Sequence, residues 1–135
     1  MSASPSPLRM LDLSGAEALW LLEGDSLGRL LYVLRGKPVI RPGRHVFEYG
    51  RLVVRTPAPT LAMPETVTYC VDEIQEATGI GWTVTVAGPA EVIRDRDEVA
   101  HCRRTLAGWV HGPHDAVLRI HPKTVTGFRL AHPEV

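Results

Sequence analysis

The sequence lacks the charge and the apolar runs that would suit it to a nucleic acid or a membrane. Its 135 residues carry 15 Lys and Arg against 15 Asp and Glu, so the formal net charge is zero. Nucleic acids and anionic membranes favour an excess of positive charge. No apolar run approaches the ~20 residues that a helix needs to span a bilayer. We therefore expect no nucleic-acid partner, no membrane partner and a cytoplasmic location.

Cysteine and aromatic residues are also scarce. Cys70 and Cys102 are the only cysteines, and they lie far apart and outside any Cys-x-x-Cys spacing. Two free thiols in a reducing compartment are a better interpretation than a disulfide. Aromatic residues make up 6% of the chain, which disfavours a surface that stacks single-stranded bases.

What remains is an ordinary globular composition, with 44% hydrophobic and 22% charged residues. A chain of this length suits one domain with one core. Residues 1–10 contain Pro5 and Pro7 and predict a flexible N-terminal tail, which leaves residues 11–135 as the single domain.

Two helices are predicted from capping signals. Ser14 precedes Glu17 at capping-box spacing, and the apolar run that follows ends near Gly24. Asp95 precedes Glu98 at the same spacing and opens a helix through about residue 107, with Val99, Cys102 and Leu106 facing inward.

The rest of the chain predicts seven or eight short strands joined by hairpin-length turns. The strand-like segments are residues 28–34, 38–41, 45–49, 52–56, 66–71, 82–87 with a bend at 88–89 into 90–93, 116–121 and 124–130. The βαβ alternation of a parallel sheet is missing. The pattern therefore favours a mainly β fold, an antiparallel barrel with two peripheral α-helices.

Familiar catalytic and metal-binding motifs are not complete. Gly79-Ile-Gly81 lacks the third glycine of a dinucleotide loop and precedes a strand. His111, His114 and Asp115 surround a Gly-Pro bend, which favours a polar loop over a metal site, and we predict no metal. His101 and Cys102 are neighbours on a helix, so their side chains diverge.

One segment has the chemistry of a phosphate cradle. Arg55-Thr56 ends a strand, and a proline-rich loop with Thr60 follows. An arginine fork, a hydroxyl and loop N–H groups together hold a dianionic phosphate. The alternative is that Arg55 is an exposed charge at a strand end, and the residues alone leave both interpretations open.

The succession of segments along the chain resembles the pyridoxamine 5'-phosphate oxidase-like flavin-binding split-barrel family. The resemblance rests on these stretches: Gly28-Arg-Leu-Leu-Tyr-Val33, Gly36-Lys-Pro-Val-Ile40, Gly50-Arg-Leu-Val-Val-Arg-Thr56, residues 71–78, residues 81–92 and residues 119–127. It implies a six-stranded antiparallel split barrel and a homodimer with FMN in a cleft between the subunits.

The same resemblance implies which residues contact the cofactor. Val39, Ile40 and Arg41 are expected beside the flavin ring. Arg55 and Thr56, with Thr60 in the following loop, are expected at the phosphate or ribityl chain. Trp82 and Trp109 are candidates for the ring or its rim, and plain packing of either indole is the alternative.

The sequence departs from the family pattern at two places. The loop from Pro57 to Met63 has no lysine where relatives often place one on the phosphate, and residues 42–45 replace a Pro-Val-Asn-Tyr segment. Losing one such cation removes a contact of about 1.5–3 kcal/mol. Arg44 or His45 is the candidate replacement.

Two hypotheses about function follow. The first is a flavin-dependent oxidoreductase that acts on a small molecule with FMN, or with the deazaflavin coenzyme F420 in its place. The second is a non-enzymatic or degenerate split-barrel dimer that binds a deazaflavin or another ligand, or no flavin. No residue in the sequence selects a substrate.

Overall fold

Eight strands and two helices make up the part of the chain that the computed structural model describes, which is residues 7–59, 63–107 and 115–133. In chain order these elements are β1 (Arg9–Asp12), α1 (Gly15–Glu23), β2 (Leu27–Leu34), β3 (Lys37–Glu48), β4 (Arg51–Thr56), β5 (Thr66–Ile74), β6 (Gly81–Val92), α2 (Arg96–Thr105), β7 (Ala116–Ile120) and β8 (Thr124–Ala131).

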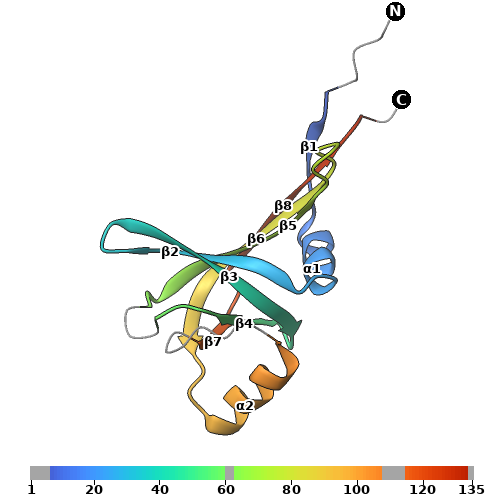
Figure 1. Cartoon of the computed structure of the whole chain (residues 1–135). Coiled ribbons are helices and arrows are strands. Elements are labelled where there is room, and N and C mark those ends of the chain that lie inside the picture. Colours follow the sequence, from blue (N-terminus) through green and yellow to red (C-terminus); the bar gives the residue numbers. More distant parts are fainter. Residues whose placement is uncertain (1–6, 60–62, 108–114, 134–135) are drawn as a thin grey trace, which may run out of the picture.

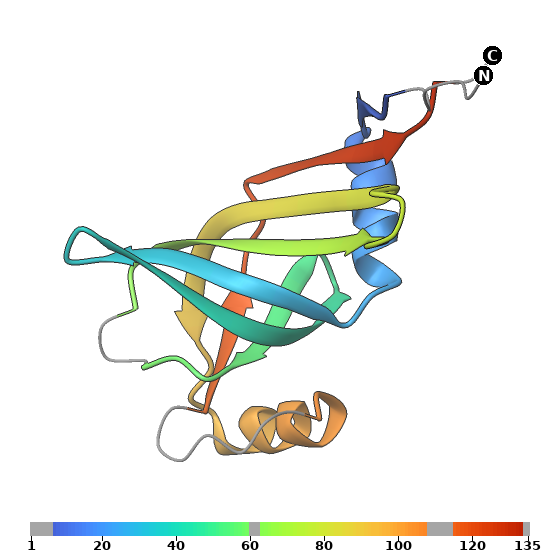
Figure 2. The same ribbon diagram turned by 45° about the horizontal axis from the view of Figure 1, so that its top comes forward.

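Six of the strands close into an antiparallel barrel (Figures 1 and 2). The sheet order is β1-β8-β6-β5-β2-β3-β4-β7, and a further pairing of β6 with β7 closes the ring. Strands β8 and β1 extend the sheet beyond β6. The predicted fold class, a six-stranded antiparallel split barrel with two helices, is confirmed.

Strand β6 is long enough to pair both with β8, outside the barrel, and with β7, where the barrel closes. Its first part pairs with β5 and β8, and its last residues, from Ala90, pair with β7. The sequence predicted two segments separated by a bend at Gly88. The structure has one strand, and a Cβ on Gly88 would lie 1.9 Å from the His121 carbonyl oxygen. Glycine is therefore required where these two segments of backbone meet.

Strand β3 is also one strand where the sequence predicted two. Its first half pairs with β2 and its second half with β4, and the strand continues through Pro42 and Gly43. Those two residues lie between the two predicted segments. Gly43 is instead buried, with the Val54 side chain 3.0 Å from where its Cβ would be.

Two tight hairpins connect these strands. Arg35 and Gly36 have φ of 52° and 76°, and Tyr49 and Gly50 have φ of 54° and 73°. Two successive residues with positive φ are typical of the two-residue turns that match the twist of a hairpin. Both turns lie where the sequence predicted them.

Helix α1 covers one open end of the barrel and buries Ala18 and Leu22 in the main core. Ser14 Oγ accepts a hydrogen bond from the Glu17 N–H at 3.1 Å, as the capping signal predicted. The helix ends at Gly24, also as predicted. Its last turn leads directly to Asp25 and the start of β2.

Helix α2 covers the outer side of β4 and β7 and has its own small core. Asp95 accepts from the Glu98 N–H, and the helix buries Cys102 and Leu106, with Val99 packed beside them. These three residues are the ones that the amphipathic pattern predicted. Val53 and Val117 supply the strand side of this core.

The other differences from the sequence-based picture lie at the ends of elements. The N-terminal segment forms β1, which pairs with β8 and includes Arg9 and Met10, inside the segment that the sequence assigned to a tail. Strand β5 continues to Ile74, where a loop was predicted from Asp72. Both cysteines are free thiols, as predicted. No helix among the described residues is long and apolar enough to cross a membrane.

A buried polar pair joins α1, β3 and β5. His45 Nδ1 lies 2.8 Å from the Tyr69 hydroxyl, and His45 Nε2 lies 3.1 Å from the Leu22 carbonyl oxygen. Since a carbonyl only accepts, Nε2 carries the proton, and Nδ1 accepts from the tyrosine. Burial lowers the pKa of His45, and burial raises the pKa of Tyr69, so both groups are neutral.

The neutral His45 predicts a stability that falls on mild acidification. The unfolded chain takes up a proton near the ordinary histidine pKa of about 6.5, whereas the folded chain resists it. The free energy of unfolding is therefore constant with respect to His45 above about pH 6.5. Below that pH it falls by up to about 1.4 kcal/mol per pH unit. Urea unfolding between pH 7.5 and 5.5 measures this slope.

The matched control is His45→Gln, which removes the titrating group at the same position. Its free energy of unfolding is expected to be lower at pH 7.5 and flatter across the same pH range. Equal slopes in the two proteins would assign the pH dependence to other groups.

Candidate functional site

The residues predicted to hold a phosphate lie where β3 pairs with β4. Arg44 and Arg55 are direct partners across the two strands, so their side chains share the outer face of the sheet. Thr56 lies on the inner face, and its hydroxyl donates to the Pro42 carbonyl oxygen at 2.9 Å. The structure therefore brings Arg44, Arg55 and Thr56 to one place on the barrel.

Arg55 is bonded to other parts of the protein through all of its side-chain nitrogens. Nε and Nη2 each donate to Asp115 at 3.0 Å, in a two-pronged ion pair. Nη1 donates to the carbonyl oxygens of Leu106 and Arg103, at 2.8 and 3.3 Å. The Arg55 clamp, meaning these bonds from Arg55 to Asp115 and to the end of α2, fixes the helix against β4 and β7.

The position of the clamp has an electrostatic reason. The carbonyl groups at the C-terminal end of a helix have no helical partners and carry partial negative charge. Arg55 supplies donors to two of them and is itself balanced by Asp115. Neither the ion pair nor the helix contact was evident in the sequence, where Arg55 and Asp115 are 60 residues apart.

The residues predicted beside a flavin ring lie on both faces of β3. Val39 faces inward and packs against the main core, whereas Ile40 is 54% exposed on the outer face. Arg41 is half-buried, and its Nη1 donates to the Ile40 carbonyl oxygen at 3.0 Å. Strand alternation means that only Ile40 of the three presents its side chain to the outside of the sheet.

Ile40 belongs to a larger apolar surface, here called the outer β2–β3 face. Its side chains come from both strands, because Leu31 pairs with Ile40 across the strands and Val33 pairs with Pro38. Exposed apolar side chains on this face are Leu27, Val33, Ile40 and Val46. These exposed apolar side chains make the face a candidate contact surface.

Of the two predicted tryptophans, Trp82 lies away from this surface. Trp82 begins β6 on the inner face, beside α1, and not on the β3–β4 surface. Thr60 and Trp109 lie outside the described residues. The roles predicted for all of these side chains toward a flavin stay predictions.

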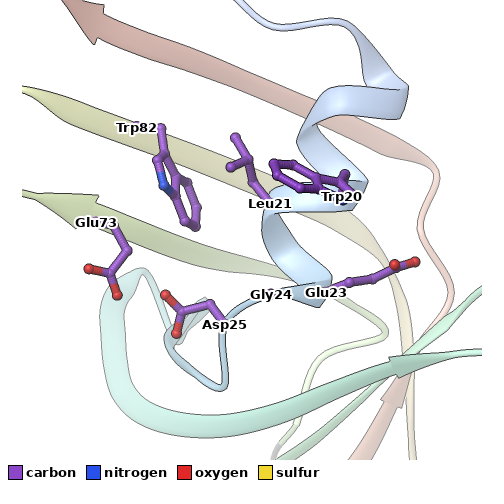
Figure 3. A pocket seen from close by; sticks show the side chains of 7 residues that line it. All are labelled: Trp20, Leu21, Glu23, Gly24, Asp25, Glu73 and Trp82. Atoms are coloured by element: carbon purple, nitrogen blue, oxygen red, sulfur yellow. The ribbon is translucent and has the colours of Figure 1, made fainter.

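Trp82 lines a cavity that is large enough for a small molecule. This α1 cavity, between α1 and the ends of β5 and β6, has a volume of about 530 Å³. Its lining residues are Trp20, Leu21, Glu23, Gly24, Asp25, Glu73 and Trp82. Figure 3 shows Trp82 on one side, Trp20 and Leu21 on the other, and the carboxylates of Asp25 and Glu73 pointing toward one another below.

The two facing carboxylates have opposite pKa shifts. Burial works to raise the pKa of Asp25, but the N–H groups of Leu27 and Ser26 and the bond to Glu73 outweigh it, so the pKa is lowered. The hydrogen bond to Asp25, together with its charge, raises the pKa of Glu73. Asp25 is therefore the ionised partner, and Glu73 is the one that more readily holds a proton.

The second cavity, of about 400 Å³, lies between α2 and the β3–β4 turn. Arg119 lies at its base and is held by Glu91 and Glu98, at 3.0 and 2.6 Å. The buried Nε of Arg119 has no hydrogen-bond partner among the described residues. Cys102 also lines this cavity, and burial raises the pKa of its thiol, which makes it a poor nucleophile.

Sequence reasoning missed Trp20, Asp25 and Glu73. They come from a helix, the loop after it and the far end of β5, so no local pattern links them. Ligand cavities are usually lined mainly by apolar side chains, and this one has carboxylates among its lining residues, so a search for apolar segments would not find it.

Comparisons with known proteins give a consistent result. A family model described as pyridoxamine 5'-phosphate oxidase matches residues 14–129. An uncharacterised protein of Mycobacterium tuberculosis is 33% identical over 138 residues, which cover 95% of this chain and 91% of the relative.

Solved structures agree with this family. A Corynebacterium glutamicum protein assigned as a pyridoxamine 5'-phosphate oxidase is similar with a TM-score of 0.73 and 27% identity, covering 93% of this chain and 99% of that one. An FAD-binding protein of Mycobacterium smegmatis has a TM-score of 0.66 and 27% identity, covering 91% and 98%.

The Arg55 clamp predicts a large loss of stability when its acid is removed. The side chains of Arg55 and Asp115 are only 12% and 19% exposed. Asp115→Ala leaves a mostly buried guanidinium without its ion pair, and we expect the free energy of unfolding to fall by about 2 kcal/mol. Chemical denaturation measures this loss.

Asp72→Ala is the matched control, since it breaks the ion pair of Asp72 with Arg29, whose side chains are 36% and 57% exposed. Screening by water limits that pair to less than about 1 kcal/mol. Equal losses in the two variants would mean that the Arg55 clamp contributes no more than a surface contact.

Proposed function

The chain belongs to the pyridoxamine 5'-phosphate oxidase family, and we propose that it is a homodimer that binds FMN for electron transfer with a small molecule. The observation that carries the proposal is the family match from residue 14 to residue 129, which spans the whole barrel. The two free thiols suit the reducing, cytoplasmic compartment that the proposal assumes.

The outer β2–β3 face and the adjacent β3–β4 pairing are the surfaces proposed for the flavin and the second subunit. Ile40 offers apolar contact, and Arg44 and Arg55 place positive charge beside it on the same face. A flavin has an apolar ring and an anionic tail, which suits a surface that changes from apolar to basic along one strand. When bound, the cofactor supplies hydride or electron transfer, and the protein supplies position and electrostatics.

The phosphate fits this region only with a rearrangement at Arg55. The guanidinium already donates to Asp115 and to the end of α2, and the Thr56 hydroxyl already donates to Pro42. A phosphate at Arg55 must therefore displace some of these acceptors. Neighbours of this fold include FAD-binding proteins, so FAD and a deazaflavin are tested beside FMN.

A second candidate function follows from the same bonds. Asp115 already accepts the hydrogen bonds that Arg55 would give to a phosphate, and residues 57–63 contain no lysine. These two features suit a barrel dimer that binds flavin weakly or not at all. In that case the apolar outer face serves association alone.

Association through the outer β2–β3 face is tested by placing a charge on it. Ile40→Glu puts a carboxylate where the proposal buries an apolar side chain, and an unpaired buried charge is strongly unfavourable. We expect the variant to be monomeric in sedimentation or light scattering at concentrations where the parent protein is a dimer.

Met10→Glu on β1 is the matched control, because Met10 is 62% exposed and Ile40 is 54% exposed. It is expected to leave the dimer intact. A dimer that survives Ile40→Glu, or that is equally lost with Met10→Glu, would contradict this interface.

Flavin binding is tested by an absorption spectrum of the purified protein and by titration with FMN, FAD, riboflavin and a deazaflavin. We expect Arg55→Ala to weaken FMN binding by about three- to tenfold, less than one full charge-assisted contact, because in the parent protein the phosphate must first displace Asp115 from the guanidinium. Riboflavin, which has no phosphate, is expected to bind both proteins alike.

Asp115→Ala separates this role from folding, because it breaks the same clamp but keeps the arginine. It is expected to retain FMN affinity, since the guanidinium is released for the phosphate. Unchanged FMN affinity in Arg55→Ala would move the phosphate away from Arg55. A parent protein that binds none of the four compounds would support the second candidate.

A further inference from the structure

The α1 cavity combines a volume, a charge and an aromatic lining that together describe a ligand. We propose that it binds a small organic ammonium ion, with the N–H groups on Asp25 and Glu73 and the hydrocarbon part against Trp20 and Trp82. The site lies apart from the β3–β4 surface, and the inference does not depend on the proposed flavin function.

The size of the cavity suits a small molecule. Its volume of about 530 Å³ falls within the range of 300–1,000 Å³ typical of ligand sites. It lies at a stable part of the fold, since α1 buries Leu22 in the main core and Trp82 packs against the same core. The helix and the strand that carry the two indoles are therefore held in place before any ligand arrives.

The charge of the cavity is negative. Asp25, Glu73 and Glu23 line it, and no Lys, Arg or His is among its described lining residues. In Figure 3 the Glu23 side chain points away, whereas Asp25 and Glu73 face one another. Two carboxylates in contact repel each other unless one holds a proton or a cation lies between them.

The orientation of Asp25 is fixed by the backbone. Its Oδ1 accepts from the N–H groups of Ser26 and Leu27, at 2.7 and 3.0 Å. Oδ2 is therefore the oxygen turned toward Glu73, and it is available to an ammonium N–H in the same direction. A carboxylate held in this way loses little freedom when it binds.

The aromatic walls favour an organic cation over a metal ion. Trp20 is 71% exposed on α1, where an indole gains little from packing. An indole face attracts a cation, and tryptophan is the best aromatic side chain for it. Magnesium and calcium need six or more oxygen ligands, whereas this lining offers few carboxylates beside two indoles and Leu21.

The position of the cavity separates it from the surface proposed for the flavin. Trp82 and Glu73 are register partners on β6 and β5, and both face the inner side with α1. Ile40, Arg44 and Arg55 face the outer side of β3 and β4. An ammonium ligand and a flavin are therefore expected to bind without competing.

The test is isothermal titration of the full chain with benzylammonium, with benzyl alcohol as the neutral compound of the same shape and tetramethylammonium as the cation without N–H groups. We expect one site per chain, and at least tenfold weaker binding of benzyl alcohol. Tetramethylammonium is expected to bind more weakly than benzylammonium, because it cannot donate to the carboxylates.

Variants locate the site. Glu73→Gln keeps a side chain that can bond to Asp25 but removes a charge, and we expect about tenfold weaker binding of benzylammonium. Trp20→Ala, at an exposed position, is expected to weaken binding by about two- to fivefold, the range of an exposed cation–π contact. Glu65→Gln, just before the other end of β5, is the charge-matched control and is expected to bind like the parent protein.

Three results would overturn the inference. Equal affinity for benzyl alcohol and benzylammonium would make the cavity an apolar patch without charge recognition. Equal loss in Glu73→Gln and Glu65→Gln would assign binding to overall charge. Displacement of benzylammonium by FMN, or no binding of any of the three probes, would mean that this cavity is not a separate ammonium site.

Discussion

The structure depends on how one buried tyrosine is accommodated at the centre of the barrel. Tyr69 is fully buried, and Gly28 and Gly43, which face one another across β2 and β3, leave the space that its ring fills. A Cβ at Gly28 would lie 2.5 Å from the ring. Packing therefore requires glycine at Gly28, and at Gly43 a Cβ would make a tight contact of 3.3 Å with the tyrosine hydroxyl, inside a sheet where glycine is otherwise unfavourable.

The tyrosine hydroxyl needs a partner at that depth, and His45 supplies it. The second nitrogen of His45 then donates to Leu22 at the end of α1. One chain of two hydrogen bonds thus fixes the helix to the barrel. Because Asp25 follows directly after that helix end, the same bonds position the carboxylate that faces Glu73.

Alternation along β3 separates the two surfaces that carry chemistry. His45 faces inward, toward α1 and its cavity, whereas its neighbour Arg44 faces outward opposite Arg55. Carboxylates line the α1 cavity, whereas the outer face carries Arg44 and an Arg55 that is paired with Asp115. Residues adjacent in the sequence therefore belong to two different sites.

Local signals in the sequence predicted most helices and strands but did not predict which residues form the sites. Ser14 and Asp95 marked both helix starts, and segments rich in strand-forming residues located most of the strands. The predicted strands exclude Pro42 and Gly43, because the side chains that pack on Gly43, those of Val54 and Tyr69, come much later in the sequence. The partners of Arg55 and the walls of the α1 cavity are equally distant in sequence, so no spacing rule finds them.

The Arg55 clamp sets a condition on any anion that binds at the β3–β4 surface. A phosphate that takes the guanidinium replaces a carboxylate in a two-pronged pair, so the exchange gains little by itself. It also removes donors from the end of α2, which rests on β4 and β7 mainly through a small apolar core. Affinity must therefore come mainly from other groups, such as the apolar outer face and a second subunit. A flavin at this place would be coupled to the docking of α2, because both compete for the same arginine.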